Sequence, residues 1–390
     1  MLEFVLPLLL LLLPLAVWSG YRVGRKTPTQ NTTGNRLSQR YFTGLNYLLN
    51  EEPDKAIDTF IELLQVDSDT VETHLALGNL FRRRGEVDRA IRIHQNLIAR
   101  PSLTGNIRKL SLLELANDYM TAGLFDRAES LFKELVKDSE YRQTSMVNLV
   151  TIYQQMKEWQ RAIDISRQIA QNSGKSQANK IAHYYCEIAE EAEQSGDLRT
   201  AHEVLIKAIS VHRSSVRASI LEGELFQRSG KYKQAIKSYR RIRHQDITFL
   251  PEVLQQLSSC YKMASSEQDL LKFLNECLQQ GAGVSVLLLV SELLQAEGKE
   301  KLAANKIADY LRDRPSLKGL EQLIHIHVRN ADGTAKENLQ LLHGLVVKLI
   351  DKKPVYRCSG CGYSGKTLFW QCPSCNEWGK IKPIFGIEGE

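Results

Sequence analysis

Two familiar hydrolase motifs are absent from this chain. It contains no H-E-x-x-H zinc-protease motif and no G-x-S-x-G nucleophile turn. Cysteine is scarce as well: there are seven in 390 residues, and four of them fall between positions 358 and 375. We expect that the protein is not an enzyme.

Net charge is small outside one segment. The formal net charge is +6, and residues 20–40 contribute five basic residues and no acidic one. The rest of the chain is therefore close to neutral. Proteins that bind nucleic acid usually present an extended basic face, so we expect no nucleic-acid partner.

A long apolar run opens the chain. From Phe4 to Trp18 every residue is apolar or proline. A helix continued to about Val23 reaches the roughly 30 Å of a bilayer's hydrocarbon core. A cleaved signal peptide is the alternative, but it needs a basic segment before the apolar run, and the only early charge is Glu3. We expect residues 1–21 to be a retained transmembrane anchor and residues 22–36 a basic juxtamembrane linker.

Basic residues directly after the run predict its orientation. Arg22, Arg25 and Lys26 follow the anchor, and basic flanks of a span stay on the cytoplasmic side. The N-terminus then points out, everything after Tyr21 is cytosolic, and the three basic side chains can touch anionic lipid headgroups. Because the cytosol is reducing, structural disulfides are not expected, and the clustered cysteines are expected to bind a metal.

From about residue 37 to 350 the sequence has a helical repeat. Its anchor residues recur with spacings of 34, 38, 34, 39, 34, 35, 33 and 32 residues. Five positions before several anchors stands a glycine, which suits a turn with positive φ between two helices. The anchors are Ala56, Ala90, Ala128, Ala162, Ala201, Ala235, Leu270, Ala303 and Ala335, and the glycines are Gly85, Gly123, Gly196, Gly230 and Gly298.

A period of 34 with this pattern resembles the tetratricopeptide repeat, TPR. The resemblance covers about nine repeats within residues 37–350. It is weaker in the last three, where Leu270 replaces an alanine and Ser265 and Asn330 replace glycines, and the tryptophan of the TPR pattern is missing. Such repeats stack into an all-α superhelical solenoid with a concave groove that binds partners. The alternative is solenoid packing without a binding role.

In the TPR pattern the first helix of each repeat faces the groove. Asn79, Arg82 and Arg83 occupy such positions in the second repeat, and Asn117 occupies one in the third. The two asparagines are equivalent, which resembles TPRs that clamp an acidic peptide end. We expect these four residues to bind a partner and the two arginines to be exposed, although a solvated helix face explains each one singly. Cys186, Cys260 and Cys277 are expected to be buried core residues.

The last forty residues, 351–390, form a candidate metal-binding domain. Cys358-x2-Cys361-x10-Cys372-x2-Cys375 presents two thiolate pairs, and four thiolates make a tetrahedral site. Gly362 and Asn376 follow the two pairs and tolerate left-handed backbone. The aromatic residues expected to wrap the cluster are Tyr356, Phe369, Trp370 and Trp378.

Four thiolates make a closed, structural site, whereas a catalytic zinc keeps one position open. So short a segment cannot fold on its core alone, and the metal is expected to supply most of its folding free energy. The segment resembles the rubredoxin knuckle, which carries one iron, although its spacer is shorter. We expect one bound metal ion, iron or zinc. A redox dithiol is the alternative to metal binding.

Anchor, repeats and rubredoxin-like knuckle together resemble the lipopolysaccharide assembly protein B family over the whole chain. The resemblance implies a bacterial inner-membrane, single-pass adaptor that limits lipopolysaccharide synthesis. It implies that the membrane protease FtsH and the deacetylase that commits lipid A precursors are partners, the adaptor helping the protease to degrade the deacetylase. A role in gathering the synthesis enzymes at the membrane is also implied. Two other classes stay open: a membrane-tethered electron carrier on a TPR scaffold, and an enzyme with a site assembled from scattered residues.

Overall fold

The computed structural model describes residues 18, 32–50, 52–66, 71–101, 103, 105–387 and 389–390. Apart from Trp18, the expected anchor at residues 1–21 lies outside these residues, and so do Arg22, Arg25 and Lys26. None of the helices in the described ranges combines the length and the apolar character needed to span a bilayer. The chain divides into two compact units, one ending at Ser145 and the other beginning at Met146.

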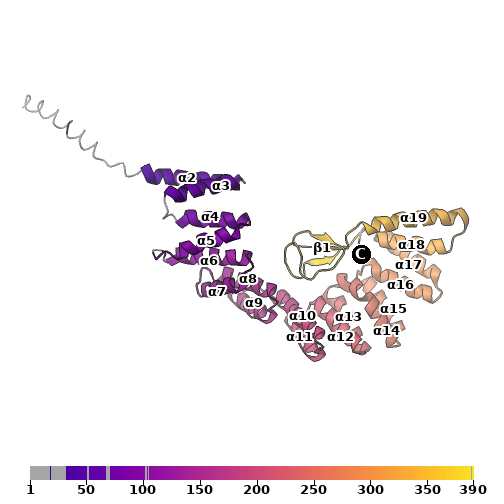
Figure 1. The fold of residues 1–390 in the computed structure, drawn as a ribbon. Helices are drawn as coiled ribbons and strands as arrows, with labels where there is room; N and C mark the ends of the chain where they lie inside the picture. The colour runs from indigo at the N-terminus through magenta and orange to yellow at the C-terminus, as the bar shows by residue number, and fades with distance from the viewer. Residues whose placement is uncertain are drawn as a thin grey trace, which may run out of the picture. The chain divides into compact units, whose positions relative to one another are not determined.

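The first unit is built from consecutive helices that pack in antiparallel pairs (Figure 1). One hydrophobic cluster of this unit includes Phe60, Leu77, Phe81 and Ala90, with partly buried aromatic and aliphatic residues packed around them. The helices are α2 (Thr32–Leu49), α3 (Pro53–Val66), α4 (Val71–Arg83), α5 (Val87–Ile98), α6 (Gly105–Thr121) and α7 (Phe125–Leu135), and α8 (Arg142–Gln155) begins in this unit.

The second unit continues the helical pairs and ends in a small sheet. Its helices are α9 (Trp159–Ser173), α10 (Ala178–Gln194), α11 (Leu198–Val211), α12 (Val216–Arg228), α13 (Tyr232–Gln245), the 3-10 helix η2 (Ile247–Val253), α14 (Leu254–Met263), α15 (Glu267–Gln279), α16 (Val284–Ala296), α17 (Glu300–Asp313), α18 (Leu317–Arg329) and α19 (Gly333–Asp351). One continuous core runs from Val216 to Ala303. Cys186, Cys260 and Cys277 are buried, as expected.

Small residues let the two helices of a pair approach closely. The repeat anchors from Ala56 to Ala303 are buried, and the alanines among them are fully so. Gly223 on α12 faces the ring of Tyr239 on α13, where a Cβ would overlap the ring atoms. The mostly helical TPR solenoid expected from the sequence is therefore confirmed. The ninth anchor differs from the others, because Ala335, in the first turn of the long helix α19, is exposed.

Most of the described turns between paired helices share one backbone conformation. The predicted turn glycines have positive φ, for example 82° at Gly85 and 72° at Gly230. Lys157 and Ser265 stand at the equivalent position in two other repeats, and they too adopt positive φ, 58° and 52°. The repeat geometry thus imposes the left-handed turn even on residues that adopt it at a cost. Asn330 differs, with φ of −104°.

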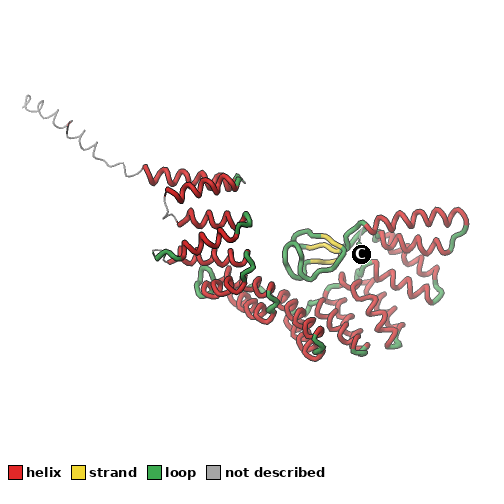
Figure 2. Tube along the Cα trace, in the orientation of Figure 1, coloured by secondary structure: helices red, strands yellow, loops and turns green. Residues whose placement is uncertain are grey.

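The C-terminal residues form a three-stranded antiparallel sheet with long loops, which Figure 2 draws in yellow and green. The strands are β1 (Tyr356–Cys358), β2 (Ser364–Gly365) and β3 (Ile381–Pro383), in the order β2-β1-β3. We call residues 355–384 the knuckle. Because its strands are only two or three residues long, hydrogen bonds of the sheet alone cannot hold it.

Two glycine substitutions test the close helix approach. Gly223→Ala should destabilise the second unit by roughly 1–3 kcal/mol, because the new methyl group overlaps Tyr239 in a filled core. Gly344→Ala is the matched control, since a Cβ there meets nothing within 4 Å inside α19. It should be neutral or stabilising by about 0.5–1 kcal/mol. Urea unfolding followed by circular dichroism measures both, and equal effects would contradict the packing described.

Candidate metal centre and its docking site

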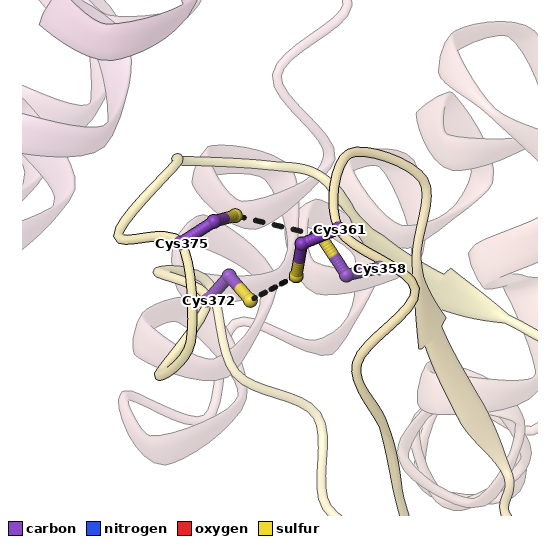
Figure 3. Close-up of side chains that lie close together, drawn as sticks. All are labelled: Cys358, Cys361, Cys372 and Cys375. Atoms are coloured by element: carbon purple, nitrogen blue, oxygen red, sulfur yellow. Dashed lines mark hydrogen bonds between the residues drawn. The ribbon is translucent and has the colours of Figure 1, made fainter. Parts of the chain in front are cut away.

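Two loops of the knuckle bring the four cysteines together (Figure 3). Cys358 ends β1 and Cys361 lies in the turn after it, while Cys372 and Cys375 come from the loop before β3. All four sulfur atoms lie within 4.8 Å of one another. The Sγ atoms of Cys358 and Cys375 are 3.8 Å apart, and those of Cys361 and Cys372 are 3.7 Å apart.

This spacing fits a tetrahedral metal site. A metal with thiolate bonds of about 2.3 Å places its ligand sulfurs about 3.8 Å from each other, which matches the separations within these two pairs. Gly362 and Asn376 have positive φ of 80° and 56°, as expected for turns that fold back on an ion. The four cysteines therefore form a metal-binding site, and a bound ion would link the two loops.

Backbone N–H groups favour the thiolate form of the first cysteine pair. A hydrogen bond from the N–H of Tyr363 lowers the pKa of the Cys361 thiol to about 6. The N–H groups of Cys361 and then Gly360 lower the pKa of Cys358. Thiolate is the form that binds metal, so the local backbone prepares these ligands. Cys358 and Cys372 are buried, whereas Cys361 is exposed at the edge of the site.

The knuckle docks on the repeats through Trp378, which is only 3% exposed. Its indole N–H donates to Oε1 of Gln154 on α8, at 2.8 Å. The ring meets Trp159 and Tyr184 edge-on, with centroids 6.3 and 5.8 Å away, and it stacks on His183 at 5.3 Å. Helices α8, α9 and α10 therefore complete the pocket of a side chain that belongs to the metal domain.

Trp370 makes a second, neighbouring contact. It stacks on Phe249 of η2 with centroids 5.7 Å apart, and its centroid lies 5.9 Å from that of the tilted His183 ring. The guanidinium of Arg217 lies 6.0 Å from the Trp370 ring and 5.9 Å from the Trp378 ring. A cation within about 6 Å of an aromatic ring is attracted to its face, so Arg217 joins both indoles to α12.

Polar contacts surround this aromatic interface. The side chain of Lys382 donates to Asp246 at 2.8 Å, and the hydroxyl of Tyr356 donates to Glu252 at 2.9 Å. The terminal residue reaches further along the repeats: Glu390 accepts from the backbone N–H and hydroxyl of Ser285 and from Lys318. The knuckle and the repeats from Met146 onward are thus one packed unit.

The expected aromatic wrapping of the cysteines is only partly right. Tyr356 packs on the cluster of Cys358, Cys372 and Ile381. Trp370 and Trp378 instead turn to the repeats, and Phe369 is 40% exposed. The physical reason is size, because a knuckle of thirty residues has no interior large enough for two indoles. That excess of large rings was the signal for a docking surface.

The loop of the first cysteine pair also fits two glycine-rich spacings. Residues 360–367 read GCGYSGKT, which satisfies both G-x-x-x-x-G-K-[ST] and G-x-G-x-x-G. Both motifs bind phosphates only where the loop leads from a strand into a helix. Here the loop joins β1 to β2, and Cys361 within it belongs to the metal site. The match is therefore one of spacing and not of structure.

The expected groove residues differ in their surroundings. Arg82 is only 19% exposed, and it donates to Glu114 at 2.7 Å and to Asp118 and Asn79 at 2.8 Å. The expected exposure of Arg82 is therefore wrong, because acidic side chains of α6 engage it. Arg83 is exposed and Asn117 is half-buried. A partner-binding role for these four residues stays a prediction.

Replacing one ligand tests the metal centre. Cys372→Ser removes a thiolate and substitutes a hydroxyl that does not ionise near neutral pH, so metal content should fall from about one ion per chain to near zero. The knuckle should then unfold, since a structural zinc contributes about 10–16 kcal/mol to folding in comparable peptides. The helix content of the repeats should stay, because repeats contact mainly their neighbours.

Metal analysis and circular dichroism measure the two effects. Cys277→Ala is the control, since that buried thiol lies in α15, outside the site, and its loss should leave the metal in place. Metal retained at one ion per chain in Cys372→Ser would show that the ligand set is wrong.

Family models match both parts of the chain. One described as a rubredoxin metal binding domain matches residues 356–383, which contain all four cysteines. Two described as tetratricopeptide repeats match residues 73–104 and 186–248. Among solved structures, a tetratricopeptide repeat protein from Parabacteroides merdae covers 80% of this chain and 98% of its own, with 12% identity and a TM-score of 0.35.

Two relatives are similar to the chain from end to end. The lipopolysaccharide assembly protein B of Escherichia coli (strain K12) is 40% identical over 388 residues, which cover 99% of this chain and all of that protein. The protein of the same name from Haemophilus influenzae is 36% identical and covers 98% of this chain and all of its own. The chain therefore belongs to the lipopolysaccharide assembly protein B family.

Proposed function

We propose that this protein is a membrane-anchored adaptor that regulates lipopolysaccharide assembly. In this proposal residues 1–21 hold it in the bacterial inner membrane, residues 22–36 are a basic linker, and the repeats and knuckle lie in the cytoplasm. Family membership supports the pathway, since the relatives are named for lipopolysaccharide assembly. The chemistry of the adaptor is protein binding and not catalysis.

The observation that carries the proposal is the docked knuckle. A closed four-thiolate site offers no open coordination position for a substrate. The indoles of the knuckle, Trp370 and Trp378, pack against the repeats. The metal would then act as a structural clip that holds one surface, made of knuckle and helices together. Such a surface suits simultaneous contact with more than one protein.

The partners proposed are the membrane protease FtsH and the deacetylase that commits lipid A precursors. The adaptor would hold the deacetylase near the protease, and the shared membrane raises the local concentration of the proteins it tethers. Other lipopolysaccharide synthesis or transport proteins would use the same platform. Asn79, Arg82, Arg83 and Asn117 remain candidates for partner contacts in the first unit, and Arg82 is held in place there by its ion pairs with Glu114 and Asp118.

A cellular experiment tests this function. A strain lacking the gene is complemented with the wild-type chain, with Cys372→Ser, with a chain lacking residues 1–20, or with the Cys277→Ala control. The half-life of the deacetylase after translation is stopped, and the amount of lipopolysaccharide, are measured at matched protein levels. Cys372→Ser and the truncation should lengthen the half-life several-fold and raise lipopolysaccharide, and the control should behave as wild type.

Two results would count against the proposal. Normal turnover of the deacetylase in the strain without any adaptor would remove the proteolytic role. Normal turnover with Cys372→Ser, after metal loss is verified, would show that the metal-held surface has no part in it.

The proposed orientation has its own test. A reporter enzyme that works only outside the cytoplasm should be silent when it is fused after Glu390, because the basic residues 22, 25 and 26 keep the following chain inside. The same reporter fused ahead of residue 4 should be active. Activity of the Glu390 fusion would reverse the topology.

A further inference from the structure

The last helix of the repeats carries a row of uncovered leucines. Helix α19 ends the helical array, packs mainly on α18 (Figure 1) and buries Val346. Four of its leucines stay between 45% and 68% exposed among the described residues. They are Leu341, Leu342, Leu345 and Leu349, and we call them the leucine face.

The end of a repeat array needs a polar surface. In a solenoid each helix pair is covered by the next one, so the terminal pair must be polar on its outer side to stay soluble. No repeat follows α19, yet residues 338–349 read NLQLLHGLVVKL, with only one charged side chain. Contiguous apolar surface of this kind marks an interaction site, so we expect the leucine face to be covered by a partner.

A glycine beside the leucine face has no packing role inside the chain. Gly344 stands in the interior of α19, where glycine weakens a helix relative to alanine. A Cβ built there meets no atom within 4 Å, whereas a Cβ at Gly223 would overlap Tyr239. Gly344 therefore makes no room for a neighbour of its own chain, but it leaves room for a side chain that approaches from outside.

Two opposite charges lie on the same line of the helix as this glycine. The residues of that line are spaced by four, three and four positions, and such spacing aligns side chains along one face. They are Glu337, Leu341, Gly344 and Lys348, and the two charged side chains are exposed. The line thus has an acid at one end, a base at the other, and a leucine and an open position between them.

We propose that two copies of this chain associate through α19, with the two helices antiparallel about a two-fold axis between residues 342 and 343. Glu337 of each copy then lies opposite Lys348 of the other. Leu341 of each copy packs on Gly344 of the other. Both contacts occur twice, because a two-fold interface is self-complementary. A parallel pair would instead place like charges opposite each other, so the order of the charges favours the antiparallel one.

A second copy explains the surface better than a bilayer does. Helices that lie on membranes carry basic side chains beside their apolar face, and a bilayer gives no reason for Glu337 to stand in line with Leu341. It also gives no reason for the open position at Gly344. The pattern that reads the same from both copies is the one that a two-fold axis requires.

The size of the interface predicts a modest affinity. One helix face on each side buries less than the roughly 800 Å² per partner of a standard stable complex, so we expect a dissociation constant of roughly 1–100 μM. Chains that share a membrane would meet at a higher local concentration, a consequence that rests on the proposed anchor. The dimer would present two knuckle-and-repeat surfaces, and a partner with several subunits could be held at two points.

Association is measured on the full chain, purified with its metal, by sedimentation equilibrium in a density-matched mild detergent. Leu341→Glu should weaken the dimer by about tenfold or more, because it places a charge at the centre of the interface. Leu198→Glu is the matched control, since Leu198 begins α11 and is 44% exposed. The control should stay within about threefold of wild type, as expected for an exposed residue outside the interface. Unchanged metal and helix content verify that the variants are folded.

A charge exchange tests the antiparallel register. Glu337→Lys and Lys348→Glu each bring like charges together at two symmetric places, so each should weaken association by about fivefold or more at low salt. The double variant restores opposite charges in reversed order, and its affinity should return to within about threefold of wild type. Both side chains are exposed, so the fold of the single chain should not change.

Three results would overturn the proposal. A wild-type chain that stays monomeric up to about 500 μM, beyond the affinity expected for this area, would leave the face to another occupant. Quenching of a dye on Leu341→Cys by brominated lipids would then identify that occupant as the membrane surface. A dimer that Leu341→Glu leaves unchanged would be formed elsewhere on the chain. A double charge variant that associates no better than the single ones would exclude the antiparallel pairing of α19.

Discussion

The burial of Trp378 against the repeats is the interaction on which the C-terminal half of the molecule depends. A fully buried tryptophan removes about 150–250 Å² from water, worth roughly 4–6 kcal/mol by area. Inside the knuckle no such burial is available, because its sheet has strands of two or three residues. The pocket is instead formed by Trp159, Tyr184 and His183, with Gln154 satisfying the indole N–H. The knuckle therefore relies on the helices to bury its large aromatic side chain.

The metal site and the aromatic interface are connected through the loop that carries Cys372 and Cys375. Metal binding brings together two loops separated by ten residues, and Trp370 and Trp378 flank the second loop. Fixing the cysteines would also restrict the positions of the two indoles, both of which contact His183. A bound metal would thus act on the repeats through the positions of Trp370 and Trp378.

The repeats and the metal site could be predicted because their signals are local. Each C-x-x-C pair and each recurring alanine can be recognised within a few residues of sequence. Even where Lys157 and Ser265 replace the turn glycine, the backbone keeps the predicted positive φ. Docking residues were not predictable in this way. Gln154, His183 and Arg217 come from three helices, and each is unremarkable in its own repeat. Only the superhelix brings them to one place, and a single sequence carries no record of that.

The same limit explains why the predicted exposure of Arg82 was wrong. Its position in the repeat suggests an exposed groove, but its acidic partner Asp118 lies 36 residues away, on α6. Asp118 also pairs with the buried His94, at 2.5 Å. An arginine that neutralises a fully buried carboxylate is held by that carboxylate, because leaving either charge unpaired is strongly unfavourable. Side-chain charge alone therefore does not distinguish a groove residue from a link between repeats.

In the second unit, Arg217 is another buried cation that is held by carboxylates. Its guanidinium is almost fully buried between two carboxylates of α10 and two indoles of the knuckle. The indoles cover it only while the knuckle is docked, and water would reach the cation if they left. Its hydration would then replace the cation–π contacts, and the ion pairs with Glu187 and Glu190 would weaken in the higher dielectric. Docking of the knuckle and the ion pairs between α10 and α12 are therefore linked. A change at the metal site that released the knuckle would weaken these ion pairs, although neither helix carries a metal ligand.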